Sequence, residues 1–153
     1  MGTDYFVMEQ IEYIKMPTVK IAETKDSVTY KTNRITELKN FDYIYKGHLV
    51  SDDAKQLLEM FLPHNEWFLH GYVDSEKNTI ASFWRLDAAE YVPGEGTVFR
   101  PDGLVQELRL SDEQSPAVCK VKSPKGTVSL IAHLAVAESM LRRGIMGIKF
   151  TRI

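Results

Sequence analysis

The chain closes on Ser139-Met140-Leu141-Arg142-Arg143-Gly144-Ile145-Met146-Gly147-Ile148-Lys149-Phe150, in which an apolar helix stops at a glycine and a short terminal strand follows. Gly144 can adopt the left-handed conformation that ends a helix, and the two arginines before it suit the negative end of the helix dipole. Apolar residues at helical spacing extend this helix back to His133, which falls where a helix cap belongs. We therefore predict a helix over about residues 134–143, followed by a strand that runs to Ile153.

An earlier stretch, Leu49-Val50-Ser51-Asp52-Asp53-Ala54-Lys55-Gln56-Leu57-Leu58, also combines a strand, a cap and a helix. The Ser51 side chain can accept a hydrogen bond from a free backbone N–H, and the two aspartates place negative charge at the positive end of the helix dipole. Apolar residues follow at helical spacing until Pro63 ends the helix. The sequence therefore predicts another principal helix over about residues 51–62.

Runs of aromatic and β-branched residues predict strands elsewhere in the chain. They fall at Tyr5–Ile14, Trp67–Val73 and Thr79–Leu86, and a polar turn joins the last two as a hairpin. Two glycine-containing turns, Pro101-Asp102-Gly103 and Ser123-Pro124-Lys125-Gly126, predict two more hairpins because glycine can take the positive φ of a tight turn.

The segment from Lys15 to Lys46 has a weaker pattern, which predicts loops and short edge strands. Many strands, two principal helices and no regular alternation of strand and helix are typical of an α+β fold. We therefore predict a single domain over residues 1–153 with a largely antiparallel, curled sheet.

Composition narrows the possible functions. The 153 residues are 44% hydrophobic, which is enough to bury one core without a disulfide or a structural metal. The net charge of −2 and the pI near 6.1 argue against non-specific binding to nucleic acid or to a lipid surface, and fit a basic partner better. No signal peptide or transmembrane run is evident, so we expect a cytoplasmic protein.

Catalytic and metal motifs are missing from the sequence. The single cysteine, Cys119, is expected to be a buried hydrophobic residue, and the histidines His48, His64, His70 and His133 form no paired metal-ligand motif. No nucleophile elbow or phosphate-binding loop is present. We predict no enzyme activity, cofactor or metal.

Acidic residues and tryptophans are the remaining candidates for a site. Basic and aromatic residues mix between Lys31 and Lys46 as in single-strand nucleic-acid binders, but acidic residues interrupt them. Trp67, Trp84 and Tyr91 are expected to be core residues or interface anchors.

Four segments of the sequence are distinctive when they are taken together: Gly47–Leu58, Ser82–Ala89 with its Asp87, the strand Val98–Arg100, and the ending Leu141–Phe150 with its Gly144-Ile145-Met146-Gly147 turn. Together they resemble a family of bacterial immunity proteins from polymorphic toxin systems. The resemblance covers about residues 42–153, and its motifs are structural rather than catalytic.

The resemblance implies a small cytoplasmic protein that binds a cognate toxin domain and blocks it, without turnover. Such an inhibitor needs a preformed surface with aromatic anchors and complementary charge. A toxin that acts on nucleic acid is expected to be basic, so we look for the matching acidic face in the loops. The predicted partner-binding residues are Glu90, Glu95, Asp102, Asp112 and Glu113.

Two alternatives stay open from the sequence. One is a small hydrolase that uses His133 or His70 with a nearby carboxylate, which predicts a pocket with the two groups within hydrogen-bonding reach. The other is a self-associating adaptor or structural protein, which predicts a large exposed apolar patch.

Overall fold

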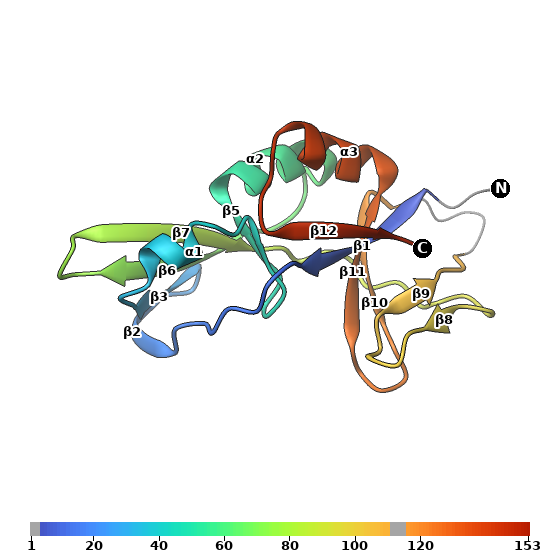
Figure 1. Ribbon diagram of the computed structural model, residues 1–153, viewed down its shortest axis with the longest axis horizontal. Coiled ribbons are helices and arrows are strands. Elements are labelled where there is room, and N and C mark those ends of the chain that lie inside the picture. Colours follow the sequence, from blue (N-terminus) through green and yellow to red (C-terminus); the bar gives the residue numbers. More distant parts are fainter. Residues whose placement is uncertain (1–3, 111–115) are drawn as a thin grey trace. The chain divides into compact units, whose positions relative to one another are not determined.

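The structure is a computed structural model that describes residues 4–110 and 116–153 (Figure 1). The helices are α1 (Ile35–Leu38), α2 (Asp52–Phe61) and α3 (Leu134–Arg142). The strands are β1 (Tyr5–Gln10), β2 (Val19–Glu23), β3 (Ser27–Lys31), β4 (Tyr43–Ile44), β5 (Leu49–Ser51), β6 (Phe68–Asp74), β7 (Thr79–Arg85), β8 (Val98–Phe99), β9 (Val105–Glu107), β10 (Val118–Lys122), β11 (Val128–His133) and β12 (Ile148–Arg152). This mixture confirms the α+β class.

The chain divides into two compact units. Unit 1 comprises Met1–Glu9, Ala88–Gly144 and Lys149–Ile153, and unit 2 comprises Gln10–Asp87 and Ile145–Ile148. This division into units does not test the expectation of a single domain over residues 1–153, which stays a prediction. None of the helices in the described part of the chain is long and apolar enough to cross a membrane.

Unit 1 is built on a sheet with the strand order β10-β11-β1-β12. β11 pairs antiparallel with β10 and with β1, so that Cys119 lies opposite Ile131 and Tyr5 opposite His133. β9 packs its one buried residue, Val105, into the same apolar cluster as Val7. α3 follows β11 directly, and the His133 side chain caps its first turn.

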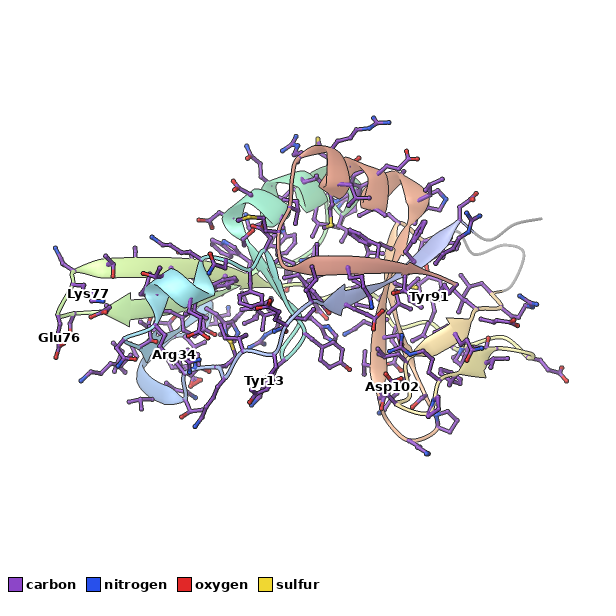
Figure 2. All side chains as sticks on the ribbon, in the orientation of Figure 1. Tyr13, Arg34, Glu76, Lys77, Tyr91 and Asp102 are labelled. Atoms are coloured by element: carbon purple, nitrogen blue, oxygen red, sulfur yellow. The ribbon has the colours of Figure 1, made fainter. Side chains whose placement is uncertain are left out.

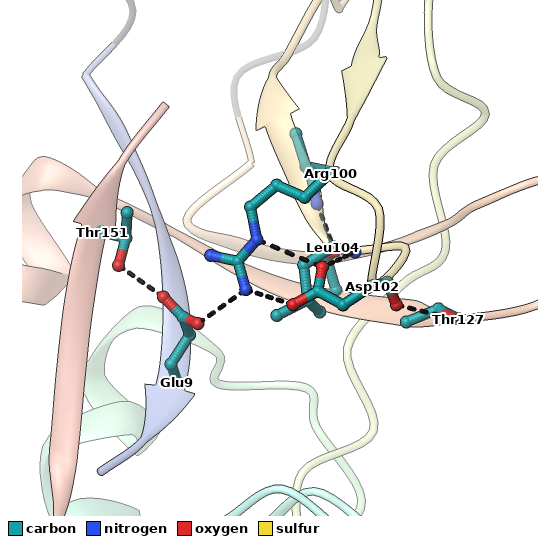
Figure 3. A network of polar contacts seen from close by, with 8 residues as sticks. Glu9, Arg100, Asp102, Leu104, Thr127 and Thr151 are labelled. Atoms are coloured by element: carbon teal, nitrogen blue, oxygen red, sulfur yellow. Dashed lines mark hydrogen bonds and ion pairs between the residues drawn. The ribbon is translucent and has the colours of Figure 1, made fainter.

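A polar network joins the β8–β9 hairpin to β1 and β12 in unit 1 (Figure 3). Arg100 donates to Glu9 at 3.0 Å and to Asp102 at 2.5 Å, and the Thr151 hydroxyl donates to the other oxygen of Glu9. Burial alone raises the pKa of Glu9, but the hydrogen bonds from Thr151 and Arg100 outweigh it and hold that pKa below its ordinary value. Glu9 is therefore ionised and bound on both sides.

Unit 2 is built on a six-stranded sheet with the order β2-β3-β6-β7-β5-β4. β3 and β6 are parallel, and the other neighbouring strands are antiparallel. α1 covers one face, where Ile35 and Leu38 pack with Tyr72 and Phe83. Because side chains alternate along a strand, Trp84 points to the opposite face, which α2 covers.

The carboxylate of Asp42 ties the start of α2 to the turn that precedes β12. Asp42 accepts a hydrogen bond from the Ser51 hydroxyl at 2.5 Å and another from the Met146 backbone N–H at 2.5 Å. The backbone of Asp42 also exchanges hydrogen bonds with the same two residues. Ser51 in turn caps α2 by accepting from the Ala54 N–H at 3.2 Å.

The two predicted helices are confirmed within a residue or two, as are the three predicted hairpins. The strands form three sheets, however, where we expected one. The weakly patterned segment from Lys15 to Lys46 contains α1 and the interior strand β3, not only edge strands. α1 has four residues, which is too short for helical periodicity to show in the sequence.

We predict that Gly147→Ala destabilises the protein more than Gly144→Ala. Both glycines have positive φ, +74° and +68°, so each substitution carries a conformational cost of about 1 kcal/mol. A Cβ on Gly147 also meets the Phe41 ring at 2.9 Å, whereas a Cβ on Gly144 meets nothing within 4 Å. Overpacking brings the expected loss for Gly147→Ala to about 2–4 kcal/mol in urea unfolding. Equal losses for the two variants would contradict this packing.

We also predict that Glu9→Gln costs about 1–3 kcal/mol of stability near neutral pH. The substitution removes the half-buried carboxylate charge that forms an ion pair with Arg100. The folded-state pKa of Glu9 lies below its ordinary 4.5, so its contribution is present above that pH and is lost as the pH falls through the folded value. Urea unfolding at a series of pH values from neutral downward should show the stability difference between wild type and variant shrinking as the pH falls. The exposed Glu12→Gln serves as the control, and a difference independent of pH would argue against this role.

Candidate functional site

The predicted acidic residues that the structure describes lie on three separate segments of unit 1. Glu90 is exposed and forms an isolated parallel bridge with Lys120, and Glu95 is exposed in the turn between Gly94 and Gly96. Asp102 lies in the β8–β9 turn. Asp112 and Glu113 lie outside the described residues.

Asp102 is held by its own hairpin. Its carboxylate accepts from Arg100 Nε at 3.1 Å and from the Leu104 backbone N–H at 3.0 Å, in addition to the ion pair with the Arg100 guanidinium (Figure 3). The hydrogen bond from Arg100 is the main reason that the pKa of Asp102 lies below its ordinary value. Much of the negative charge of Asp102 is therefore balanced within the hairpin.

His70 contacts a guanidinium on one ring nitrogen. Its Nε2 lies 3.1 Å from an Arg85 nitrogen, and because a guanidinium only donates, Nε2 accepts this hydrogen bond. Burial and then the charge of Arg85 lower the pKa of His70 to about 4. The ring also stacks on Tyr30 and meets Phe68 edge-on, so His70 is a neutral, packed residue.

Two further candidates have structural partners. His133 Nδ1 accepts from the Ala135 N–H at 3.2 Å as the cap of α3, and its ring packs edge-on against Tyr5. Cys119 is buried, and this burial raises the pKa of its thiol to about 12. Within residues 4–110 and 116–153, no three His, Cys, Asp or Glu side chains gather as a metal site requires.

The outward side of α2 and two neighbouring tryptophans form a surface that we call the α2 face. Its residues are Asp52, Asp53, Lys55, Glu59, Met60, Trp67 and Trp84. The amphipathic helix produces this side, because Ala54, Leu57 and Leu58 are buried while the acidic residues remain outside. Met60 is 64% exposed, so this side of the helix also presents one large apolar side chain to solvent.

Trp84 anchors the α2 face to the sheet. Its indole N–H donates to Asp52 at 2.6 Å, at the first turn of α2. The Lys55 ammonium lies 4.6 Å from the ring centre of Trp84 and 5.6 Å from that of Trp67, within the range of a cation–π interaction. Lys55 also forms an ion pair with Glu59, one turn along the helix.

The α2 face carries more negative than positive charge. Three of its side chains are carboxylates, and its one ammonium is already occupied by two rings and Glu59. Sequence analysis identified both tryptophans as core residues or anchors but did not place them beside the acidic start of α2. The position of Trp84 beside the start of α2 depends on the pairing of β5 with β7, in which Val50 lies opposite Trp84. No hairpin turn joins these two strands, so the sequence alone does not predict their register.

Comparison with known proteins identified no relative of this chain. No family model matches the chain, and no curated protein matches it.

Proposed function

We propose that this chain is a non-enzymatic immunity protein of a polymorphic toxin system, one that binds a cognate bacterial toxin domain in the cytoplasm and blocks it. The observation that carries the proposal is the α2 face, where two tryptophans contact Lys55 and Trp84 also contacts Asp52, on a helix that exposes Asp53, Glu59 and Met60. The resemblance in the strand, cap and helix segments supports the same conclusion. The expected partner is a protein with a basic surface.

The composition of the α2 face suits a protein–protein interface. Tryptophan is enriched among the residues that carry most binding energy, and methionine adapts to a partner's shape. Trp84 is held by Asp52 and Lys55 before any partner arrives, so little conformational freedom is lost on binding. The face can therefore act as a preformed anchor.

The charge of the α2 face suits a basic toxin. Asp53 and Glu59 are exposed, and their carboxylates can attract a positively charged partner and orient its approach. The acidic loops of unit 1 remain predicted contacts, although the charge of Asp102 is reduced by its ion pair with Arg100. We therefore place the first contact at the α2 face.

The first test is affinity capture of the tagged full chain from its source, with the retained protein identified by mass spectrometry and the stoichiometry measured by light scattering. A single toxin domain in fixed ratio, whose toxicity is relieved when this chain is co-expressed, supports the proposal. Growth arrest that persists at full expression of this chain would refute inhibition of that toxin. Sedimentation at several concentrations distinguishes the self-associating alternative.

We predict that the double variant Asp53→Lys and Glu59→Lys slows association with the captured toxin by at least about tenfold at low salt, because steering depends on local charge. Stopped-flow fluorescence can follow the reaction directly, since the chain has two tryptophans, Trp67 and Trp84, and both lie on this face. The matched control is Asp26→Lys, an exposed acid on the β2–β3 turn of the same unit. An unchanged rate for the double variant, with slower binding by Glu90→Lys or Glu95→Lys, would move the interface to unit 1.

We further predict that Lys55→Gln strengthens binding to the same toxin. Lys55 is the one cation of the α2 face, and its removal uncovers both ring faces and the Glu59 carboxylate. A partner's arginine or lysine could then occupy the position that the Lys55 ammonium holds. The expected change is a faster association and a slower dissociation. Weaker binding by a folded Lys55→Gln variant would show that Lys55 itself contacts the partner.

A further inference from the structure

Two neighbouring hollows lie at one end of the six-stranded sheet in unit 2. Their volumes are about 290 and 270 Å³, and Asn33 and Asp74 line both of them. The parallel strands β3 and β6 both end here, at Lys31 and Asp74. In open α/β sheets, ligands bind in the crevice at the carboxyl ends of parallel strands, where the chain connections diverge. Here the chain leaves β3 toward α1, while β6 turns back into β7.

Asp74 is the most buried acid of unit 2, with 4% of its surface exposed. Its Oδ1 accepts from the backbone N–H groups of Glu76 and Lys77, at 3.1 and 3.2 Å, which fixes the carboxylate in the hairpin turn. Among the described residues, no donor forms a hydrogen bond with the other oxygen, Oδ2. Oδ2 is not sealed from solvent. One oxygen of a buried carboxylate therefore remains open to the hollows.

The Thr79 hydroxyl is a second unsatisfied group at the same place. Thr79 lines the 270 Å³ hollow and lies opposite Asp74 in the β6–β7 register. Its oxygen is buried and has no hydrogen-bond partner in the described part of the chain. Buried polar atoms without a partner are uncommon, so the Thr79 hydroxyl, opposite the partly paired Asp74 carboxylate, indicates that a hydrogen-bonding group is missing at this place.

The charge around Asp74 is mostly positive. Lys31, Lys39 and Lys77 line the hollows, against one further carboxylate, Glu76. Figure 2 shows Glu76 and Lys77 at the outer tip of the β6–β7 hairpin, beside this end of the sheet. A simple cation bound at Asp74 would share the hollows with three lysines, and a simple anion beside the lysines would leave the Asp74 carboxylate without a cation.

We propose that this pair of hollows binds a small zwitterion, an α-amino acid, with its ammonium group on Asp74 and its carboxylate on the lysines. A buried carboxylate is stabilised most by a charged donor, and the lysines supply the complementary cations for the other end. The volumes lie near the lower end for ligand sites, which fits a molecule of this size. The amides of Asn33 and Asn40 favour a polar side chain on the ligand. This inference does not depend on the toxin-binding proposal.

The test is isothermal titration calorimetry of the full chain with L-glutamine and L-serine as probes. Ethylamine and acetate carry one charge each, and inorganic phosphate and ribose 5-phosphate represent anionic ligands. We expect saturable binding of at least one amino acid, at least tenfold tighter than ethylamine or acetate. No binding by any probe, or tighter binding of phosphate or ribose 5-phosphate than of both amino acids, would overturn the proposal.

Variants assign the binding to these hollows. Asp74→Asn keeps the acceptor for the two backbone N–H groups but removes the charge, and should weaken amino-acid binding at least tenfold. The double variant Lys39→Gln and Lys77→Gln changes two exposed side chains and should weaken it similarly without affecting the fold. Lys125→Gln, on the β10–β11 turn of unit 1, is the matched control. Binding that survives both site variants would contradict the inference, and if Asp74→Asn does not fold, the lysine variant alone decides.

Discussion

The hydrogen bonds of Asp42 are the constraint on which the arrangement of unit 2 depends. One carboxylate binds both the Ser51 hydroxyl, which caps α2, and the Met146 N–H in the turn before β12. Ser51 belongs to the stretch Leu49–Leu58 and Met146 to the closing stretch Ser139–Phe150, the two segments on which the predicted helices were based. Hydrogen bonds to a charged acceptor are stronger than neutral ones, so a single side chain fixes two segments that are far apart in the chain.

The α2 face follows from this constraint. Ser51 is both the last residue of β5 and the cap of α2, and β5 pairs with β7 so that Ser51 lies opposite Phe83. α2 therefore starts directly beside β7, the strand that carries Trp84. This position explains why the indole N–H reaches Asp52 in the first turn of the helix. One turn of helix then brings Lys55 over the ring. No loop separates β5 from α2, since Ser51 ends the strand and Asp52 begins the helix.

Local signals in the sequence predicted much of the fold. Ser51, Gly144 and Pro63 mark helix ends by their own chemistry, and Gly103 and Gly126 mark turns by their positive φ of +95° and +93°. These effects act over a few residues, so one sequence is enough to find them.

Long-range pairings could not be predicted in the same way. The parallel pairing of β3 with β6 joins strands separated by α1, β4, β5 and α2, and no local pattern encodes it. The candidate sites depend on such pairings. Asp102 was identified as an acid in a loop, but its neutralisation by Arg100 and the approach of Lys55 to Trp84 are contacts in space. The sequence therefore indicated which types of residue form the candidate sites, but not which of them contact one another in the fold.

Charge distribution, rather than net charge, decides where this protein can attract a partner. A net charge of −2 over 153 residues produces little attraction by itself. In unit 1 the Asp102 carboxylate forms an ion pair with Arg100, and Glu90 lies opposite Lys120 in an isolated β-bridge. On the α2 face the single lysine is drawn onto the tryptophan rings and Glu59, which leaves Asp53 without an opposite charge from that lysine. The Lys55 ammonium also shows that the two indole rings accept a cation in this geometry.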